Sequence, residues 1–452
     1  MENRSKLLAR FLVPSIVGII LFMIPVKYGG EWTICVKILA DMIGSALGNI
    51  LPGLCVAIIT ISAIMSVIAL SKPKFITGNA ILNDTFSTSL IWVIIRVIGA
   101  IFIWLVFLGV GEGGTGFVSM ITDGGAGGFV LSDLLTVLVI IFAIAGLLLP
   151  LLLDFGLLEF VGALLTKVMR PLFKIPGRAA VDCFTSWIGD GTLGVMLTCN
   201  QYESGYYSAR EASVIATTFS AVSITFSIVV LAQVDLMEYF GVYYLLICLI
   251  GIVCAIISPR IPPLSRKKDD YLVEGKAMPE TIPPQYKNSL DYGTDLALKK
   301  SAEFKGIGQF LENGLKNSVG MWFGVLPTVM AIGTITLMLA NNTPIFEYLG
   351  KPFLPLLELL QVPEAAEASK TMIVGFTDMF TPSIIAAESI TSAMTKFIIA
   401  VVSVTQLIYL SEVGGLILGS KLPVKLWELF VIFLERTIIS LVIVCPLAHL
   451  IF

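Results

Sequence analysis

The chain has 452 residues, of which 56% are hydrophobic and 13% are charged, and its mean hydropathy is +0.93. These values exclude an ordinary soluble globular protein. The net charge of −3, without a basic block, gives no reason to expect a nucleic-acid partner. A single histidine cannot build an imidazole site for zinc or haem.

Apolar stretches recur along the chain, and each is long enough to cross the roughly 30 Å hydrocarbon core of a bilayer. We therefore predict an all-α, polytopic membrane protein. The first span is expected to be a membrane helix rather than a signal peptide, because no small-residue cleavage site follows it. The predicted spans are 8–26, 51–71, 89–110, 131–153, 209–232, 237–258, 318–340, 396–418 and 428–450.

The first part of the chain, residues 1–130, holds three of these spans and no sign of a hairpin within the membrane. We predict that it is a scaffold or the contact surface of a homo-oligomer. Residues 109–114 match the G-x-G-x-x-G pattern of nucleotide-binding loops. They follow an apolar helix rather than a strand, so we do not expect a nucleotide site there.

Two later stretches of the chain resemble each other at a spacing of about 188 positions. Gly162 pairs with Gly350 (350 − 162 = 188) and Asp190 with Asp378 (378 − 190 = 188). In each copy, an apolar segment too short to cross the membrane twice is interrupted by Gly, Asp and Thr. Short, interrupted and repeated hydrophobic segments are typical of the binding site of a secondary transporter. A chance match among apolar helices is the alternative.

This repeat sets the predicted domain organisation. The first unit is 131–258, with a re-entrant hairpin at 179–205, and the second is 318–452, with a hairpin at 366–394. Between them, residues 259–317 are polar and contain several prolines, which predicts a cytoplasmic linker with a short helix near 294–312.

Basic residues predict the orientation of the chain in the membrane. Lys and Arg gather before the first span and at the start of the linker, whereas residues 111–130 contain neither. The positive-inside rule then places the N-terminus and the linker in the cytoplasm and the C-terminus outside. In this topology the two units enter the membrane from opposite sides, so we predict inverted repeats whose hairpins meet near the midplane.

Small and polar residues at the hairpin tips are the candidate solute-binding groups. Glycine lets the backbone approach a solute closely, and the N-terminus of a half-helix attracts a carboxylate, a phosphate or a carbonyl. In the second hairpin, Thr381 is expected to be the N-cap and Pro382 the first helical residue. The candidate residues are Gly189, Asp190, Gly191 and Thr192 in the first hairpin, and Thr377, Asp378, Thr381 and Ser383 in the second.

The two aspartates, Asp190 and Asp378, lie in apolar surroundings, where an ionised carboxylate needs a partner. Each is a candidate ion-coupling residue, as a Na⁺ ligand or a proton carrier, or an anchor for a substrate amine. The alternative is a helix cap at a solvated turn. We expect no cofactor beyond Na⁺ or H⁺ as the coupling ion.

Each hairpin is followed by a predicted span with polar residues at its middle. We predict that these residues form a polar lining around the solute. The hydroxyls could instead bond to their own helices. Glu435 and Arg436 lie inside the last span and predict an internal ion pair, with a coupling role as the alternative. The candidate lining residues are Ser220, Ser223, Thr405 and Gln406.

The segment "SWIGDGTLGVML" followed by "ASVIATTFSAVSIT" resembles the Gate, or nucleoside-recognition, domain. The chain looks more specifically like the YjiH-like family of bacterial membrane proteins. Gate domains also occur in concentrative nucleoside transporters and in spore maturation proteins. The resemblance implies a bacterial inner-membrane protein built from two inverted units of hairpin and broken helix, which move like an elevator against a scaffold.

The residues and the resemblance together predict an ion-coupled secondary transporter, not an enzyme. Its partners would be a small-molecule solute, the lipid bilayer and a second copy of the chain. The charges at the hairpin tips favour an amino-acid-like or dipeptide-like solute, and a nucleoside is the alternative. A protein of another class, a membrane assembly or sensor component without transport activity, also fits the sequence.

Overall fold

The computed structural model describes residues 4–28, 31–189, 191–219, 222, 224–273 and 283–452. These residues are almost entirely helical, as predicted. The exception is a two-stranded antiparallel sheet, in which β1 (Pro25–Tyr28) pairs with β2 (Glu31–Ile34). The sequences PVKY and EWTI contain the β-branched and aromatic residues that favour strands. This small sheet joins the first two helices of the chain.

Seven stretches of helix among the described residues are long and apolar enough to cross a membrane, which indicates an integral multi-pass membrane protein. Each contains or overlaps one of the predicted spans. The seven are Arg4–Phe22, Cys35–Ala69, Leu90–Phe107, Phe117–Leu153, Met237–Arg266, Ile307–Leu339 and Leu426–Ile451.

Two of the nine predicted spans are not continuous helices, and this corrects the sequence interpretation. The predicted span 209–232 consists of α14 (Ala209–Thr218) and α15 (Ile224–Gln233). The predicted span 396–418 consists of α24 (Ala393–Thr405) and α25 (Val413–Gly419). We call Phe219 and Val222, the described residues between α14 and α15, the first break, and residues 406–412 the second break. The polar middles of both predicted spans therefore mark interruptions.

The two units contain the same order of elements. The helix that precedes the hairpin begins at Leu157 in the first unit and at Ile345 in the second, a spacing of 188 residues (345 − 157 = 188). The first unit comprises α9 (Thr136–Leu148), α10 (Pro150–Leu153), α11 (Leu157–Phe173), α12 (Ala179–Phe184), η3 (Thr185–Gly189), α13 (Gly191–Glu203), α14, α15 and α16 (Phe240–Ile257). The second comprises α19 (Leu326–Asn342), α20 (Ile345–Gly350), α21 (Leu354–Leu359), α22 (Ala365–Val374), α23 (Thr381–Ser389), α24, α25 and α26 (Leu426–Ile451).

In each unit a glycine allows a close approach between the hairpin and the helix that precedes it. A Cβ atom built on Gly177 would lie 2.3 Å from the carbonyl oxygen of Gly162, and one built on Gly350 would lie 2.2 Å from that of Ser369. Only a residue without a side chain fits such contacts. Packing therefore explains the glycine at position 350 and, in the first unit, the glycine at position 177, which contacts Gly162.

The N-terminal region packs against both units. Its longer helices are α1 (Arg4–Met23), α2 (Cys35–Leu47), α3 (Leu51–Ala69) and α6 (Leu90–Phe107). Helix α6 lies along α19, where a Cβ atom on Gly99 would come within 2.2 Å of the Pro327 carbonyl oxygen. The buried Arg96 of α6 is held by Ser66 Oγ at 2.7 Å and by the Thr85 carbonyl at 3.0 Å.

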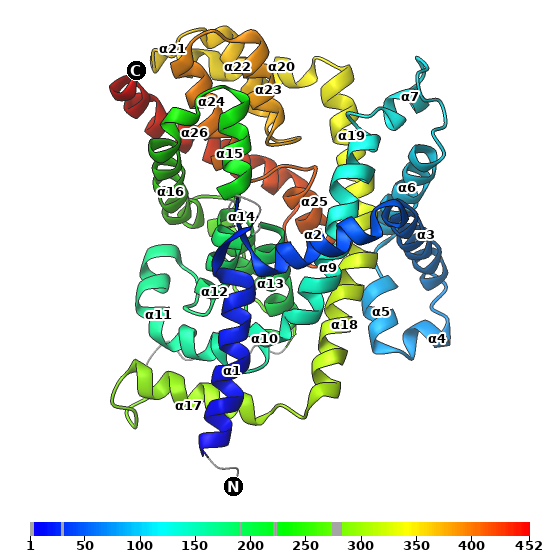
Figure 1. Ribbon diagram of the computed structural model, residues 1–452, viewed down its shortest axis with the longest axis vertical. Coiled ribbons are helices and arrows are strands. Elements are labelled where there is room, and N and C mark those ends of the chain that lie inside the picture. The colour runs from blue at the N-terminus through cyan, green and yellow to red at the C-terminus, as the bar shows by residue number, and fades with distance from the viewer. Residues whose placement is uncertain (1–3, 29–30, 190, 220–221, 223, 274–282) are drawn as a thin grey trace.

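The predicted linker folds onto the first unit. It contains α17 (Ser289–Ala302), and α18 (Ile307–Gly324) begins within its predicted range. Helix α17 packs on α11 and α1. In Figure 1, α17 lies near the N-terminal end of the molecule and α12 near its middle, whereas α20 to α23 lie at the opposite end, near the C-terminus.

Candidate functional site

The tip of the second hairpin is organised by Asp378. Its Oδ1 accepts hydrogen bonds from the backbone amides of Phe380 at 2.8 Å and Thr381 at 3.2 Å. Asp378 therefore satisfies the free amides at the start of α23. The prediction that Thr381 is the N-cap is wrong, because Thr381 is the first helical residue and Pro382 the second.

The second break is bonded to this tip. The amide of Leu410 donates to the Phe376 carbonyl at 2.8 Å, and the amide of Ser411 to the Thr377 carbonyl at 2.9 Å. The Ser411 hydroxyl also donates to Asp378 Oδ2 at 3.0 Å. The tip and the second break thus form one hydrogen-bonded assembly.

Other polar residues of the second unit bond locally. The hydroxyl of Thr377 donates to the Val374 carbonyl and that of Ser383 to the Phe380 carbonyl, both at 2.7 Å. These are bonds within a single turn, of the kind that hydroxyls often form in helices. Neither hydroxyl needs a solute to satisfy its donor.

Gln406 joins three elements of the second unit. Its Nε2 donates to the Met372 carbonyl at 2.8 Å and to Thr437 Oγ1 at 2.9 Å. A Cβ atom on Gly375 would lie 2.2 Å from Gln406 Oε1, so the hairpin can approach this side chain only because residue 375 is glycine. Gln406 therefore fixes the position of the second break between α22 and α26.

The first hairpin has a different tip. Between α12 and α13 the chain forms a short π-helix, η3, an irregularity that is frequent at functional sites. Gly189 ends η3, and the buried residues Gly191 and Thr192 begin α13. Three of the predicted site residues, Asp190, Ser220 and Ser223, lie outside the described residues.

A buried carboxylate in this hairpin was missed in the sequence analysis. Asp182 is fully buried, and its Oδ2 accepts hydrogen bonds from Tyr207 at 3.0 Å and Thr198 at 3.2 Å. Its Oδ1 has no partner among the described residues, and the hydroxyls of Thr185 and Ser186 have none either. The signal was an aspartate inside the apolar run AAVDCF, since such residues are rare within membrane proteins.

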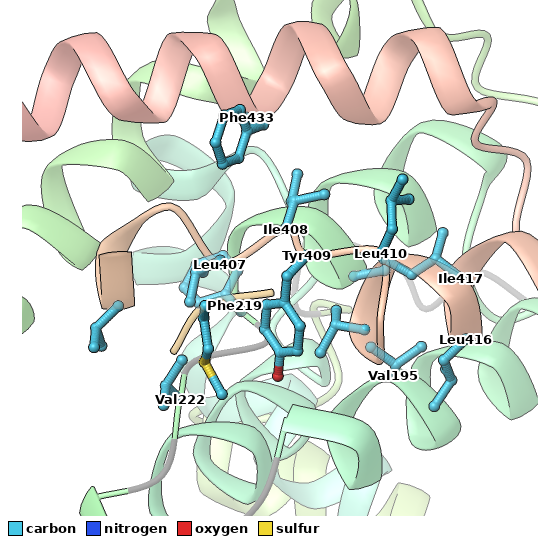
Figure 2. Packing of buried hydrophobic residues seen from close by; sticks show 14 of the residues in the cluster. Val195, Phe219, Val222, Leu407, Ile408, Tyr409, Leu410, Leu416, Ile417 and Phe433 are labelled. Atoms are coloured by element: carbon cyan, nitrogen blue, oxygen red, sulfur yellow. The ribbon is translucent and has the colours of Figure 1, made fainter. Parts of the chain in front are cut away.

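A small cavity of about 20 Å³ lies where elements of both units meet. In Figure 2, Phe219 and Val222 of the first break approach Leu407 of the second break. The backbone of Leu407 has φ of 60°, a left-handed conformation that non-glycine residues adopt at some cost in energy. The cavity is lined by Trp187, Thr218, Phe219, Val222, Ile247, Gly251, Val404, Thr405, Leu407 and Arg436.

Arg436 of α26 lines this cavity and is 0% exposed. Its Nε donates to the Thr405 carbonyl at 3.0 Å, but its two terminal nitrogens have no partner among the described residues. The predicted ion pair between Glu435 and Arg436 is wrong, since Oε2 of Glu435 is also without a partner. Consecutive residues on a helix point about 100° apart and do not face each other.

Comparison of the sequence with known proteins shows the family of the chain. An uncharacterized protein of Alkalihalophilus pseudofirmus is 45% identical to this chain over 454 residues, which cover 100% of this chain and 96% of that protein. The chain belongs to the family of this Alkalihalophilus protein. Residues 94–237 match the family called Gate, described as nucleoside recognition. No solved structure matches the chain.

The Gate domain contains the first hairpin and the first break, and hence four cavity-lining residues, Trp187, Thr218, Phe219 and Val222. Thr405, one of the candidate lining residues, also lies on the wall of the cavity. The other predicted residues of the second unit lie at the tip of its hairpin or, in the case of Gln406, in the second break, and none of them lines the cavity. Sequence reasoning missed Trp187 as a cavity residue, because an aromatic residue in an apolar helix is usually part of the core.

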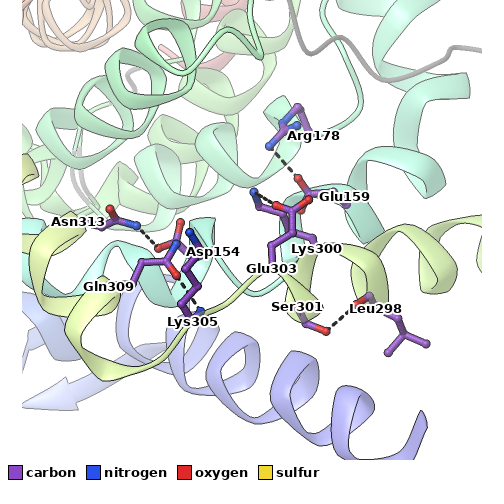
Figure 3. Close-up of polar contacts among 10 residues, drawn as sticks. All are labelled: Asp154, Glu159, Arg178, Leu298, Lys300, Ser301, Glu303, Lys305, Gln309 and Asn313. Carbon is purple, nitrogen blue, oxygen red and sulfur yellow. Dashed lines mark hydrogen bonds and ion pairs between the residues drawn. The ribbon is translucent and has the colours of Figure 1, made fainter. Parts of the chain in front are cut away.

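A second polar cluster joins the Gate domain to the linker helix (Figure 3). Arg178 pairs with Glu159 at 3.4 Å, and its guanidinium lies 3.8 Å from the centre of the Tyr206 ring. Lys300 of α17 lies 6.0 Å from the same ring centre. Nearby, Asn313 of α18 donates to Asp154 at 2.8 Å. These contacts fix α17 and α18 against the base of the first hairpin.

Proposed function

We propose that the protein is an ion-coupled secondary transporter that moves a small polar organic solute across a bacterial cytoplasmic membrane. One observation carries this proposal. A cavity lies between the breaks of two units that share an order of elements, and broken helices around a central site are the usual construction of secondary transporters. The match of residues 94–237 to the Gate family supports the same function.

The two units act as inverted repeats in this proposal. Two observations support it: the matching order of elements and the distribution of basic residues along the sequence. The N-terminus and the linker then face the cytoplasm. Alternating access follows if the units carry the cavity between the two faces of the membrane while the N-terminal helices stay fixed.

Asp190 and Asp378 remain our candidates for the coupling of Na⁺ or H⁺, and Asp182 joins them because one of its buried oxygens has no partner among the described residues. We favour an amino-acid-like solute over a nucleoside. A neutral nucleoside would offer no counter-charge to Arg436, which is the charged side chain on the described cavity wall. The YjiH-like resemblance and a homo-oligomeric state belong to the same proposal.

Transport by the purified chain alone is the direct test. Proteoliposomes that contain this protein should accumulate labelled solute from pools of amino acids, dipeptides or nucleosides when a Na⁺ or pH gradient is imposed. Dissipation of the gradient with an ionophore should abolish the accumulation. If no pool enters under either gradient, while the protein is folded and reconstituted, the transport proposal is wrong and a membrane assembly or sensor role takes its place.

A further inference from the structure

We propose that the protein binds an anionic phospholipid, such as phosphatidylglycerol, in a groove between the chain that follows α16 and the start of α26. The proposal concerns this groove alone and does not depend on the transport of a solute. The groove has a volume of about 260 Å³ and is lined by Pro262, Pro263, Arg266, Lys267, Trp427, Glu428 and Val431.

The position of the groove is the first argument. One apolar stretch that can cross a membrane, Met237–Arg266, ends at the groove, and another, Leu426–Ile451, begins there. Residues 268–270, which follow the first stretch, are all charged and exposed. Because exposed charges are very unfavourable in the hydrocarbon core of a bilayer, the groove lies at the level of the lipid headgroups.

The charge of the groove wall is the second argument. Lys267 Nζ donates to Glu428 Oε2 at 2.7 Å and also to the carbonyl of Pro423, so the charges of Lys267 and Glu428 offset each other. Arg266 is exposed, and its guanidinium makes no hydrogen bond or ion pair with another described residue. The described wall thus carries one uncompensated positive charge with free N–H donors, which suits the phosphate of a lipid with one net negative charge.

The room in the groove and the surface beside it are the third argument. The 260 Å³ compares with the roughly 10–15 Å³ that one water molecule needs, so a phosphodiester group fits. Trp427 is 57% exposed, and an exposed tryptophan at the end of a membrane helix is typical of the headgroup level. Ile438 and Val442 are also exposed and lie on the same side of α26 as Trp427, since they follow it by three and four helical turns. This apolar strip offers a surface for an acyl chain.

Lipid titrations of the full-length protein in a neutral detergent test this proposal. Phosphatidylglycerol and phosphatidylcholine with identical acyl chains would be added separately, and bound lipid would be counted by native mass spectrometry. We expect phosphatidylglycerol to bind about tenfold more tightly, because it alone has a net negative charge to offset that of Arg266. Glycerol phosphate in large excess should not displace it, because this compound lacks the acyl chains.

Two charge variants place the lipid phosphate in this groove. Arg266→Gln should bind phosphatidylglycerol about tenfold more weakly and lose the preference for it. This variant should fold like the wild type, because the replaced guanidinium has no partner among the described residues. Lys268→Gln is the matched control. It removes the same charge from an exposed residue that does not line the groove, and the affinity should stay nearly unchanged.

A second pair of variants tests the space. Val431 lines the groove, so Val431→Phe should narrow it and weaken the binding of both lipids. Leu450→Phe is the matched control, because Leu450 is exposed near the other end of α26. This change should weaken the binding of neither lipid.

Equal binding of the two lipids by the wild-type protein would overturn the proposal. Equal losses in Arg266→Gln and Lys268→Gln, or no loss in either, would do the same, because the groove would then not be the site of binding. Displacement by glycerol phosphate would indicate a site for a free phosphate compound and would also overturn it. If Val431→Phe does not fold, the two charge variants still decide the matter. None of these outcomes depends on solute flux in proteoliposomes.

Discussion

The two hairpins have the same order of elements but treat their polar groups in opposite ways. In the second, both oxygens of Asp378 are bonded, one to the start of α23 and the other to Ser411 in the second break. In the first, Asp182 has a buried oxygen without a partner among the described residues, and so do Thr185 and Ser186 beside it. The carboxylate at the second hairpin is thus fully bonded, whereas the buried carboxylate of the first has an oxygen left to accept a hydrogen bond or bind an ion.

The bases of the hairpins differ in burial. In the first unit, Arg178 and Glu159 pair under α17, with side chains 2% and 9% exposed. In the second, Lys370 and Glu367 pair at the surface, with side chains 39% and 40% exposed. The exposed Glu364 accepts hydrogen bonds from the hydroxyl and amide of Thr391, which lower the pKa of its carboxyl. The base of the first hairpin is thus buried beside the linker helix, whereas the ion pair at the second is exposed to solvent.

The largest expected difference between the units is the side of the membrane from which each hairpin can be labelled. Each hairpin should be labelled from one side only. Single cysteines replacing Ser204, after the first hairpin, and Ala366, in the second, would be introduced into a cysteine-free background. In oriented membrane vesicles an impermeant maleimide should label them from opposite sides, because inverted units present their hairpin bases to opposite faces. Labelling of both from the same side would end the inverted-repeat interpretation.

The next contrast is in stability. Arg178→Ala leaves Glu159 buried without its partner and should lower the free energy of unfolding by about 3–5 kcal/mol. Lys370→Ala is the matched change in the second unit and should cost about 0–1 kcal/mol, because that pair is exposed to solvent. Unfolding curves in detergent, recorded under identical conditions, measure both values. Similar losses for the two variants would contradict the difference in burial on which the comparison depends.

A smaller effect on stability is expected where the second hairpin contacts the second break. The Cβ atom of Gly375→Ala would overlap Gln406 Oε1 and should cost about 1–3 kcal/mol of stability. The double variant with Gln406→Ala removes the overlapping atom, so the two losses should not add. Fully additive losses in the same unfolding assay would show that the hairpin and the second break are not in contact.

Sequence patterns placed the seven long apolar helices well, because a segment that crosses the membrane must be continuously apolar. Two further predicted spans are interrupted, and the sequence did not reveal the breaks between α14 and α15 and between α24 and α25. Hydropathy averages over a window, and the left-handed turn at Leu407 occurs at a residue that is itself apolar.

The candidate site was predicted in part for a related physical reason. A single sequence shows which polar residues lie within apolar runs, and this identified Thr405, Asp378 and Arg436. It does not show which of them remain without partners after packing. Arg436 was assigned an ion pair with its neighbour in sequence, although the helix turns the two side chains apart. Asp182 was not predicted, because it precedes the glycine-rich tip on which the prediction was based.

The smallest effect on stability is expected for Asp378→Asn. The same change is expected to have a large effect on ion coupling. An asparagine keeps an oxygen that can accept from the amides of Phe380 and Thr381, and its amide can donate to the Ser411 hydroxyl. The free energy of unfolding should therefore fall by about 1 kcal/mol or less. If the charge of Asp378 carries a coupling ion, proteoliposomes with this variant should exchange preloaded solute but fail to accumulate it against a gradient. Asp190→Asn is the matched change in the first hairpin. Uphill accumulation that is unchanged in both variants would leave Asp378 as a helix cap and move the search for the coupling site to Asp182.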